Sequence, residues 1–329
     1  MTSEGTPQVS VVIPTRDRCA ELTVAGLLAA IAQEGVDHEV IVVDDGSSDE
    51  TPSVLARLQE PRLRVLRNEA PRGVAAARNR GLGASRAPWV AFLDDDDLWS
   101  PRKLREQLDA AAAGADFVYT GGVVTDSSGI PVRDSPVPAP GTLAKALARR
   151  NVIGGPSAVM VGAALLARLG GFDERFSLLA DWELWIRLAR VGAPAACPEP
   201  LVAYREHGAN MSGIEIDEAY AELALLIERH EVDVDLAEFA RWLAWQQRRV
   251  GRRLPAVRAY LRGVRTARRG GLLLRAAATP FGEGVMRTPR RVRGIVGRPD
   301  PMPSSPAWIE RYRLGLGAGA GRRGIGSRG

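Results

Sequence analysis

The spacing of apolar and polar residues divides the first third of the chain into alternating strands and helices. Apolar and β-branched runs typical of buried strands cover Gln8–Ile13, Glu39–Val43, Leu63–Leu66 and Trp89–Leu93. Segments with helical spacing lie between or after them, at residues 20–34, 51–59, 74–85 and 101–113. Because each strand is followed by a helix, the pattern predicts an α/β fold with a mostly parallel sheet sandwiched by helices.

The pattern changes after residue 115. Strands are predicted at 116–120 and 123–125, and the turn Asp126–Gly129 predicts a hairpin with the residues that follow it. A short helix at 142–150, a strand at 157–161 and helices at 162–169 and 184–191 come next. Helical spacing then dominates, at 217–229, 235–250 and 255–269. We therefore predict a core domain over 1–213, a helical region over 214–278 and a flexible Arg-, Gly- and Pro-rich tail over 279–329, with one docking patch around Trp308 and Tyr312.

Composition narrows the class of protein. Of 329 residues, 45% are hydrophobic and 25% charged, and no stretch of about 18 apolar residues or secretory leader is visible, so we expect a cytoplasmic protein. Its two cysteines, Cys19 and Cys197, have no metal-ligand spacing.

Charge is distributed unevenly along the chain. From Arg241 onward, 21 arginines and three acids give a net charge of +18, which leaves −13 for residues 1–240. One interpretation of this basic C-terminus is a peripheral contact with the inner face of an anionic membrane, and the other is that the arginines only keep the helices solvated. The lack of a nucleic-acid-binding motif argues against nucleic acid.

Carboxylates follow two of the predicted strands at the point where each strand ends. Asp94, Asp95, Asp96 and Asp97 come after the fourth strand, and Asp44 and Asp45 after the second. The carboxyl ends of parallel strands form the ligand-binding edge of such sheets, where crowded carboxylates favour a cation. One interpretation is a divalent metal that carries a phosphate. The other is a solvated acidic loop before a helix that starts at Ser100-Pro101.

Two common phosphate-binding motifs are absent. No GxGxxG follows the first strand and no GxxxxGK[ST] occurs, which disfavours dinucleotide oxidoreductases and phosphate-loop nucleotide triphosphatases. Phosphate recognition would then depend on arginine and on Mg²⁺ or Mn²⁺, which prefer oxygen ligands. Asp94 and Asp96 fit such a metal, and the ionised Asp45 could accept hydrogen bonds from a base or ribose.

Seven motifs occur in a fixed order over about residues 8–212. These are Val11–Thr15, Val43–Ser47, Gly73 with Ala77–Asn79, Phe92–Trp99, Gly170–Glu174, Asp181–Trp185 and Tyr204–His207. By their order and spacing, these motifs resemble those of the inverting family 2 glycosyltransferases of the GT-A fold.

The resemblance implies a role for each candidate residue. Thr15 and Asp45 would hold the base of a nucleoside-diphosphate sugar, a UDP-sugar above others, and Arg78 would reach the ribose or phosphates. The acidic motif would supply nucleotide-sugar contacts through Asp94 and Asp95 and metal contacts through Asp94 and Asp96, with His207 as a further metal or phosphate ligand. Asp181 stands where the family has its catalytic base, which must take a proton from the acceptor hydroxyl. The acceptor would be a saccharide, a lipid-linked molecule or a small molecule.

Several alternatives stay open at this point. Asp181 could instead cap a helix, Arg78 and His207 could be ordinary surface residues, and the register of four aspartates leaves Asp95 and Asp97 undecided as metal contacts. Relatives often carry a glutamate where this chain has Ala180. The competing function classes are a nucleotidyltransferase, for which a Gly- and Lys-rich loop after the first strand is missing, and a non-catalytic nucleotide-sugar-binding protein of the same fold.

Overall fold

The computed structural model describes residues 5–19, 25–206, 215–267, 275, 279 and 306–312. His207 and most of the predicted tail over 279–329 lie outside these residues. The chain divides into two compact units: residues 1–144, 152–206 and 302–329 form one, and residues 145–151 and 207–301 form the other. Within the described ranges, no helix combines the length and apolar character needed to cross a bilayer.

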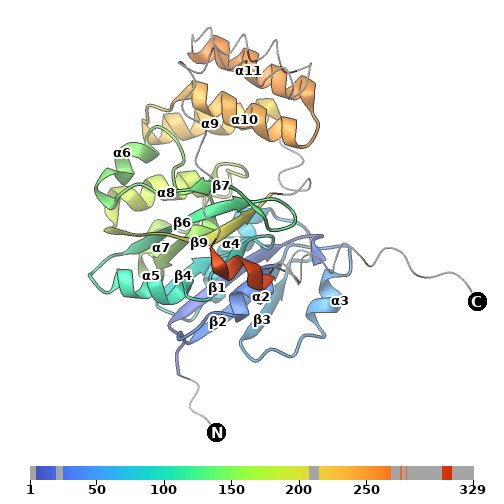
Figure 1. Ribbon diagram of the computed structural model, residues 1–329, viewed down its shortest axis with the longest axis vertical. Helices are drawn as coiled ribbons and strands as arrows, with labels where there is room; N and C mark the ends of the chain where they lie inside the picture. The colour runs from blue at the N-terminus through green and yellow to red at the C-terminus, as the bar shows by residue number, and fades with distance from the viewer. Residues whose placement is uncertain are drawn as a thin grey trace, which may run out of the picture. The chain divides into compact units, whose positions relative to one another are not determined.

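The first unit is built on one mixed sheet, and its N-terminal half confirms the predicted parallel strands (Figure 1). β1 pairs in parallel with both β2 and β4, and β2 pairs in parallel with β3. These strands span Val9–Thr15 (β1), His38–Asp44 (β2), Leu63–Arg67 (β3) and Trp89–Phe92 (β4). Because Thr15 lies opposite Asp44 and Val12 opposite Phe92, the polar residues after β1, β2 and β4 come out at one edge of the sheet.

Helices connect these strands. α2 (Leu27–Ile31), α3 (Thr51–Leu55) and α4 (Val74–Ala84) follow β1, β2 and β3 in turn. α4 packs closely because Gly81 faces Val12 of β1, where a Cβ would come within 2.4 Å of a valine methyl. The small residues of this helix therefore let it lie directly on the sheet.

The C-terminal half of the sheet is mixed. The strand order is β3-β2-β1-β4-β8-β6-β9-β5, with β7 paired to β6. β8 is antiparallel to both β4 and β6, β9 is parallel to β6, and the predicted hairpin is present as β6 and β7. These strands span Leu98–Trp99 (β5), Phe117–Thr125 (β6), Pro131–Ser135 (β7), Val159–Gly162 (β8) and Pro194–Arg205 (β9). Helices α5 (Lys103–Ala111), α7 (Ala163–Leu169) and α8 (Ala180–Val191) complete this half, and α6 (Leu143–Leu147) spans the boundary between the two units.

The second unit contains the three predicted C-terminal helices. α9 spans Ile216–His230, α10 Leu236–Arg249 and α11 Arg253–Ala267. α10 begins where Asp235 accepts hydrogen bonds from the N–H groups of Ala237 and Glu238. Tyr220 of α9 meets Phe239 of α10 edge to face, with ring centroids 5.4 Å apart, so these aromatic residues pack the two helices together.

The predicted docking patch near the C-terminus belongs to the first unit. The Trp308 indole donates a hydrogen bond to the Pro200 carbonyl at 3.1 Å, and the Tyr312 hydroxyl donates to the Trp99 carbonyl at 3.1 Å. Residues 306–312 therefore pack against β9 and β5, directly behind the acidic motif.

Candidate active site

Asp94 to Asp97 form a tight turn after β4, held by Ser157. The Asp97 N–H donates to the Asp94 carbonyl at 3.1 Å, which closes the turn. The Ser157 hydroxyl accepts the Asp94 N–H at 3.0 Å and donates to Asp97 Oδ2 at 2.6 Å. Asp97 Oδ1 accepts the Arg205 N–H at 3.3 Å, and the Trp99 indole donates to the Ser157 carbonyl at 2.8 Å. Asp97 therefore points into the protein and ties the turn to β9.

Crowding and burial change the proton affinity of this turn. Burial, reinforced by the neighbouring charge of Asp96, raises the pKa of Asp95 to about 7. Burial and the charges of Asp96 and Asp94 likewise raise the pKa of Asp97 well above its ordinary value. Buried carboxyl groups with raised pKa values ionise readily only beside positive charge. Cationic side chains next to this turn are therefore part of the site.

Further side chains, from β1, the loop after it and α4, contact the carboxylates of the turn. The Thr15 hydroxyl donates to Asp95 Oδ2 at 2.7 Å, and Arg18 Nη1 lies 3.1 Å from Asp95 Oδ1 and 2.5 Å from Asp96 Oδ2. Arg78 Nη2 lies 2.6 Å from Asp94 Oδ1. The structure therefore brings Thr15 and Arg78 to the acidic turn, as their predicted roles require, and adds Arg18.

Arg78 is aimed by an aromatic platform. Its guanidinium lies 5.3 Å from the centroid of the Phe172 ring, and Phe172 is fixed by Asn79, which accepts the Phe172 N–H at 2.8 Å and donates to its carbonyl at 2.9 Å. At Gly171 (φ +71°) a Cβ would come within 2.5 Å of Asn79 Oδ1, so this position needs glycine. Arg78 Nε is buried and has no hydrogen-bond partner among the described residues, so it can donate to a ligand.

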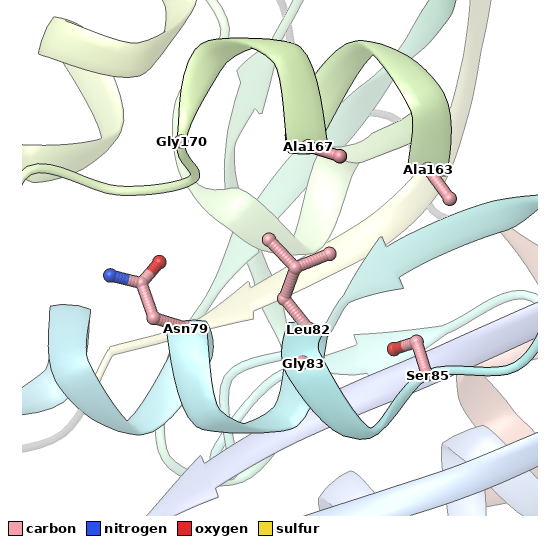
Figure 2. A pocket seen from close by; sticks show the side chains of 7 residues that line it. All are labelled: Asn79, Leu82, Gly83, Ser85, Ala163, Ala167 and Gly170. Atoms are coloured by element: carbon pink, nitrogen blue, oxygen red, sulfur yellow. The ribbon is translucent and has the colours of Figure 1, made fainter.

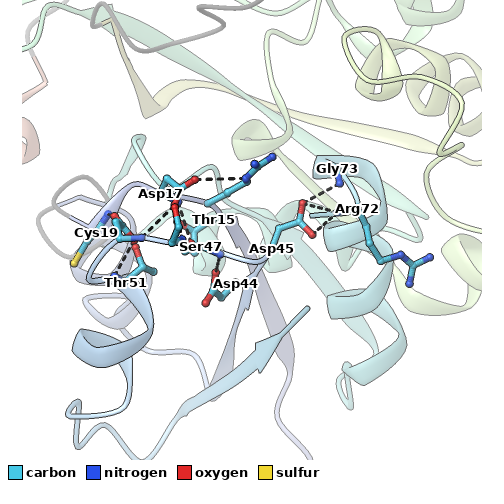
Figure 3. Close-up of polar contacts among 12 residues, drawn as sticks. Thr15, Asp17, Cys19, Asp44, Asp45, Ser47, Thr51, Arg72 and Gly73 are labelled. Atoms are coloured by element: carbon cyan, nitrogen blue, oxygen red, sulfur yellow. Dashed lines mark hydrogen bonds and ion pairs between the residues drawn. The ribbon is translucent and has the colours of Figure 1, made fainter. Parts of the chain in front are cut away.

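Asp45 holds the loop that leads into α4 (Figure 3). Its carboxylate accepts hydrogen bonds from Asn68 Nδ2 at 2.6 Å, from the Arg72 N–H at 2.9 Å and from the Gly73 N–H at 2.8 Å. Gly46 (φ +74°) follows, where a Cβ would come within 2.9 Å of the Pro71 nitrogen. These contacts leave little unused acceptor capacity on Asp45, so its orienting role for loop 68–73 is established by the geometry, while a direct contact with a base stays a prediction.

Asp181 lies in the first turn of α8, near Tyr204. Leu179 occupies the N-cap position, and Asp181 Oδ1 accepts the N–H of Trp182 at 2.7 Å. The Tyr204 hydroxyl is held by the Gly155 N–H and the Ile153 carbonyl, both at 3.3 Å. Burial and the charges of Asp97, Asp94 and Asp181 raise the pKa of Tyr204. Asp181 therefore lies within electrostatic reach of a hydroxyl that also faces the acidic turn.

The donor set of the acidic turn fits a divalent cation. Asp94 Oδ2 has no hydrogen-bond partner among the described residues, and a Cβ on Gly155 would stand 4.0 Å from it, so the glycine keeps space open there. Mg²⁺ is commonly held by one or two carboxylates, with water and substrate phosphate completing the shell. In the part of the chain that the structure describes, no three His, Cys, Asp or Glu side chains gather to form a metal site. His207, the third predicted ligand, lies outside that part.

A shallow groove lies elsewhere on the first unit, between α4 and α7 (Figure 2). None of the predicted site residues lines it. Its lining comprises Asn79, Leu82, Gly83, Ser85, Ala163, Ala167 and Gly170. Of these lining residues, Asn79 is the one that also forms hydrogen bonds with Phe172 beside Arg78.

Sequence reasoning missed three contributors to the site. Arg18 was visible in the polar loop after β1 but had no assigned partner, and Ser157 and Gly155 approach the acidic turn only through the pairing of β8 with β4. A serine after Gly-Gly-Pro has no local signature for such a role, so only the folded sheet reveals it.

Comparisons with known proteins agree with this geometry. Residues 10–163 match the model of the family described as glycosyl transferase family 2. The chain is 33% identical over 204 residues to the putative teichuronic acid biosynthesis glycosyltransferase TuaG of Bacillus subtilis, covering 60% of this chain and 79% of that protein. It is 44% identical over 110 residues to the succinoglycan biosynthesis protein ExoO of Rhizobium meliloti, covering 33% of this chain and 31% of ExoO.

The names of another relative and of a solved structure include a nucleotide. The Escherichia coli UDP-Glc:alpha-D-GlcNAc-diphosphoundecaprenol beta-1,3-glucosyltransferase WfgD is 36% identical over 101 residues, which cover 30% of this chain and 39% of WfgD. The crystal structure of Staphylococcus aureus TarS 1-349 in complex with UDP-GlcNAc superposes with a TM-score of 0.57 at 16% identity, covering 95% of this chain and 91% of that one. The structural likeness shows a shared fold.

Proposed function

The chain belongs to family 2 of the glycosyltransferases and has their GT-A fold, and on that premise we propose that it is an inverting enzyme using a nucleoside-diphosphate sugar. One observation carries the proposal. The acidic turn pairs with two arginines, and Asp181 lies close enough to Tyr204 to raise the pKa of its hydroxyl, as Asp94 and Asp97 of the turn also do. A donor diphosphate and an acceptor hydroxyl need such opposite surroundings, the first cationic and the second basic.

The donor would lie along the carboxyl edge of β1, β2 and β4. Thr15 and Asp45 shape the base and ribose region, the buried Nε of Arg78 can donate to the ribose or a phosphate, and Asp94 and Asp95 can accept from the donor's hydroxyls. UDP is the nucleotide we propose, because it appears in the names of WfgD and of the TarS complex.

A Mg²⁺ or Mn²⁺ ion would be held by Asp94 and Asp96, with His207 as a further ligand. When bound, it would stabilise the negative charge that develops on the departing diphosphate. Asp94, Asp95 and Asp96 then have the spacing of a DXD motif. Asp97 lies outside this motif and has a different role, because its carboxylate accepts hydrogen bonds from the Ser157 hydroxyl and the Arg205 N–H.

Asp181 would act as the general base. An acceptor hydroxyl must lose its proton as it attacks the anomeric carbon, and a carboxylate at hydrogen-bond distance can take it. Attack from the side opposite the departing diphosphate inverts the anomeric configuration. The first turn of a helix suits an ionised carboxylate, because the helix dipole stabilises negative charge there.

We propose a saccharide or lipid-linked acceptor and a peripheral position at the cytoplasmic face of a membrane. WfgD is named for a diphosphoundecaprenol acceptor. In this chain, α11 carries no acid, and Leu254 (75% exposed) and Leu261 (43% exposed) alternate along it with the exposed Arg258 and Arg265. Leucine and arginine on one helix face suit the interface of an anionic bilayer, to which the Arg-rich tail would add charge.

A panel of nucleotide sugars tests the function. Wild-type protein is incubated with UDP-, GDP-, ADP- and TDP-linked sugars, with Mn²⁺ and with EDTA, and release of the nucleoside diphosphate is measured. We expect Mn²⁺-dependent release from one nucleotide class, and NMR of the glycoside formed on an added acceptor should show an inverted anomeric centre. Release of pyrophosphate in a parallel assay with a nucleoside triphosphate and a sugar 1-phosphate would instead support the nucleotidyltransferase. Nucleotide binding without turnover of any donor would support the non-catalytic protein.

A further inference from the structure

Arg18 occupies the carboxylates that the metal would need. Its Nη1 lies 2.5 Å from Asp96 Oδ2 and 3.1 Å from Asp95 Oδ1, while the side chain is 24% exposed. Burial lowers the pKa of Arg18, but the charges of Asp96 and Asp95 outweigh that effect and raise it, so the guanidinium is a permanent cation. In the absence of donor, it supplies positive charge to the buried acids.

The loop that carries Arg18 is built to aim it. Asp17 has φ 53°, a left-handed conformation that is unfavourable for a residue with a side chain. It is held there because its Oδ1 accepts the N–H of Ser48 at 2.6 Å and the Ser48 hydroxyl at 3.0 Å, while its own N–H donates to Ser47 Oγ at 2.9 Å (Figure 3). The strained turn after β1 is thus anchored to the loop after β2, and the next side chain, Arg18, projects onto the acidic turn.

We propose that Arg18 is a built-in cation that holds Asp95 and Asp96 until the divalent metal arrives, and that it then moves to the donor's diphosphate. This inference rests on the proposed metal and donor site. A metal bound at Asp96 Oδ2 would compete with the guanidinium 2.5 Å from the same oxygen, and the two cations repel each other. A diphosphate offers the displaced arginine a new anion of the geometry it binds best.

The proposal has a thermodynamic consequence. Metal alone must displace Arg18 from Asp96, so it binds weakly. Metal with UDP gives Arg18 a phosphate, so each ligand strengthens the other by the same factor. Arg18 would therefore couple metal and nucleotide binding, and it would keep the acidic turn neutralised between turnovers.

Calorimetric titration of Mn²⁺ into the full-length protein, with and without UDP, tests this. Arg18→Gln removes the competing charge, so we expect its affinity for Mn²⁺ alone to rise by roughly tenfold, equivalent to about 1.4 kcal/mol, and the mutual enhancement by UDP to fall toward one. Arg16→Gln is the matched control, because Arg16 carries the same charge two residues away but pairs with Asp17 at the surface. The control should titrate like wild type.

The opposite result is equally clear. Unchanged or weaker binding of Mn²⁺ alone to a folded Arg18→Gln protein would overturn the inference while leaving the metal site intact. Absence of Mn²⁺ binding in wild type, even with UDP, would overturn the metal site and the inference together. If Arg18→Gln fails to fold by circular dichroism, Arg18→Lys keeps the charge but hydrates it more strongly. It should then show a smaller rise in Mn²⁺ affinity, and no rise would contradict the proposal.

Discussion

Replacing Ser157 with alanine removes the brace of the acidic turn. The hydroxyl makes two hydrogen bonds there, one from the Asp94 N–H and one to Asp97 Oδ2, and the side chain is completely buried. Hydrogen bonds that involve charged groups contribute about 1.5–3 kcal/mol and neutral ones about 1 kcal/mol, so we expect Ser157→Ala to lower the free energy of unfolding by about 2–4 kcal/mol. The Asp97 carboxylate would then retain the hydrogen bond from the Arg205 N–H of β9.

Urea unfolding of wild type and variant, followed by tryptophan fluorescence, measures this loss. Trp99 reports on the region because its indole donates to the Ser157 carbonyl. Ser53→Ala is the control, because Ser53 is exposed and its hydroxyl contacts only the Glu50 carbonyl one turn earlier. The same hydroxyl of Ser157 fixes the backbone of Asp94, so affinity for UDP with Mn²⁺ should also fall, by roughly tenfold. A loss of stability no larger than that of the control, with unchanged UDP affinity, would refute the brace.

Three further predictions test other parts of the account. Burial opposes ionisation of Glu39, but hydrogen bonds from Ser10, the Arg86 N–H and Arg64 lower its pKa, so the ionised Glu39 stabilises the fold above pH 4.5 and does so less as the pH falls. Glu39→Gln should lower the free energy of unfolding by about 2–3 kcal/mol at pH 7, and an equal difference between variant and wild type at pH 3.5 would contradict this. Gly155→Ala should fold normally but weaken Mn²⁺-dependent UDP binding measured by calorimetry, because its methyl would fill the space beside Asp94 Oδ2; unchanged affinity would count against a metal there. Serine at both Leu254 and Leu261 should reduce flotation with phosphatidylglycerol vesicles relative to Leu58→Ser in the first unit, and equal flotation would remove α11 as a membrane contact.

Local patterns were sufficient for the N-terminal half of the fold. The strands at Gln8–Ile13 and Trp89–Leu93 are mostly apolar runs followed by proline or aspartate, so their burial could be predicted from adjacent residues. The structure confirms them as β1 and β4, but β1 continues through Pro14 to Thr15, so the proline does not end that strand. The family resemblance implied that Thr15 and Arg78 belong to one site, and both do contact the acidic turn.

Local patterns failed where the structure depends on distant pairing. The twelve-residue strand β9 was not predicted, because Pro198 and Pro200 interrupt its alternation. It pairs with β6 through extra residues of its own that bulge beside Gly121, where a Cβ would come within 2.5 Å of the Pro198 carbonyl. α8 begins at Ala180 rather than Leu184, since the charged residues before Leu184 obscure its apolar stripe.

The most direct test of the proposed function compares Asp181→Asn with wild type in two assays on the same preparation: sugar transfer and UDP affinity in the presence of Mn²⁺. General-base catalysis contributes about 10²–10⁴-fold, so transfer should fall by that factor while the dissociation constant for UDP stays within about twofold. Asn keeps an oxygen that can accept the Trp182 N–H, so the first turn of α8 should be preserved. Transfer at the wild-type rate by Asp181→Asn would contradict the assignment of Asp181 as the base.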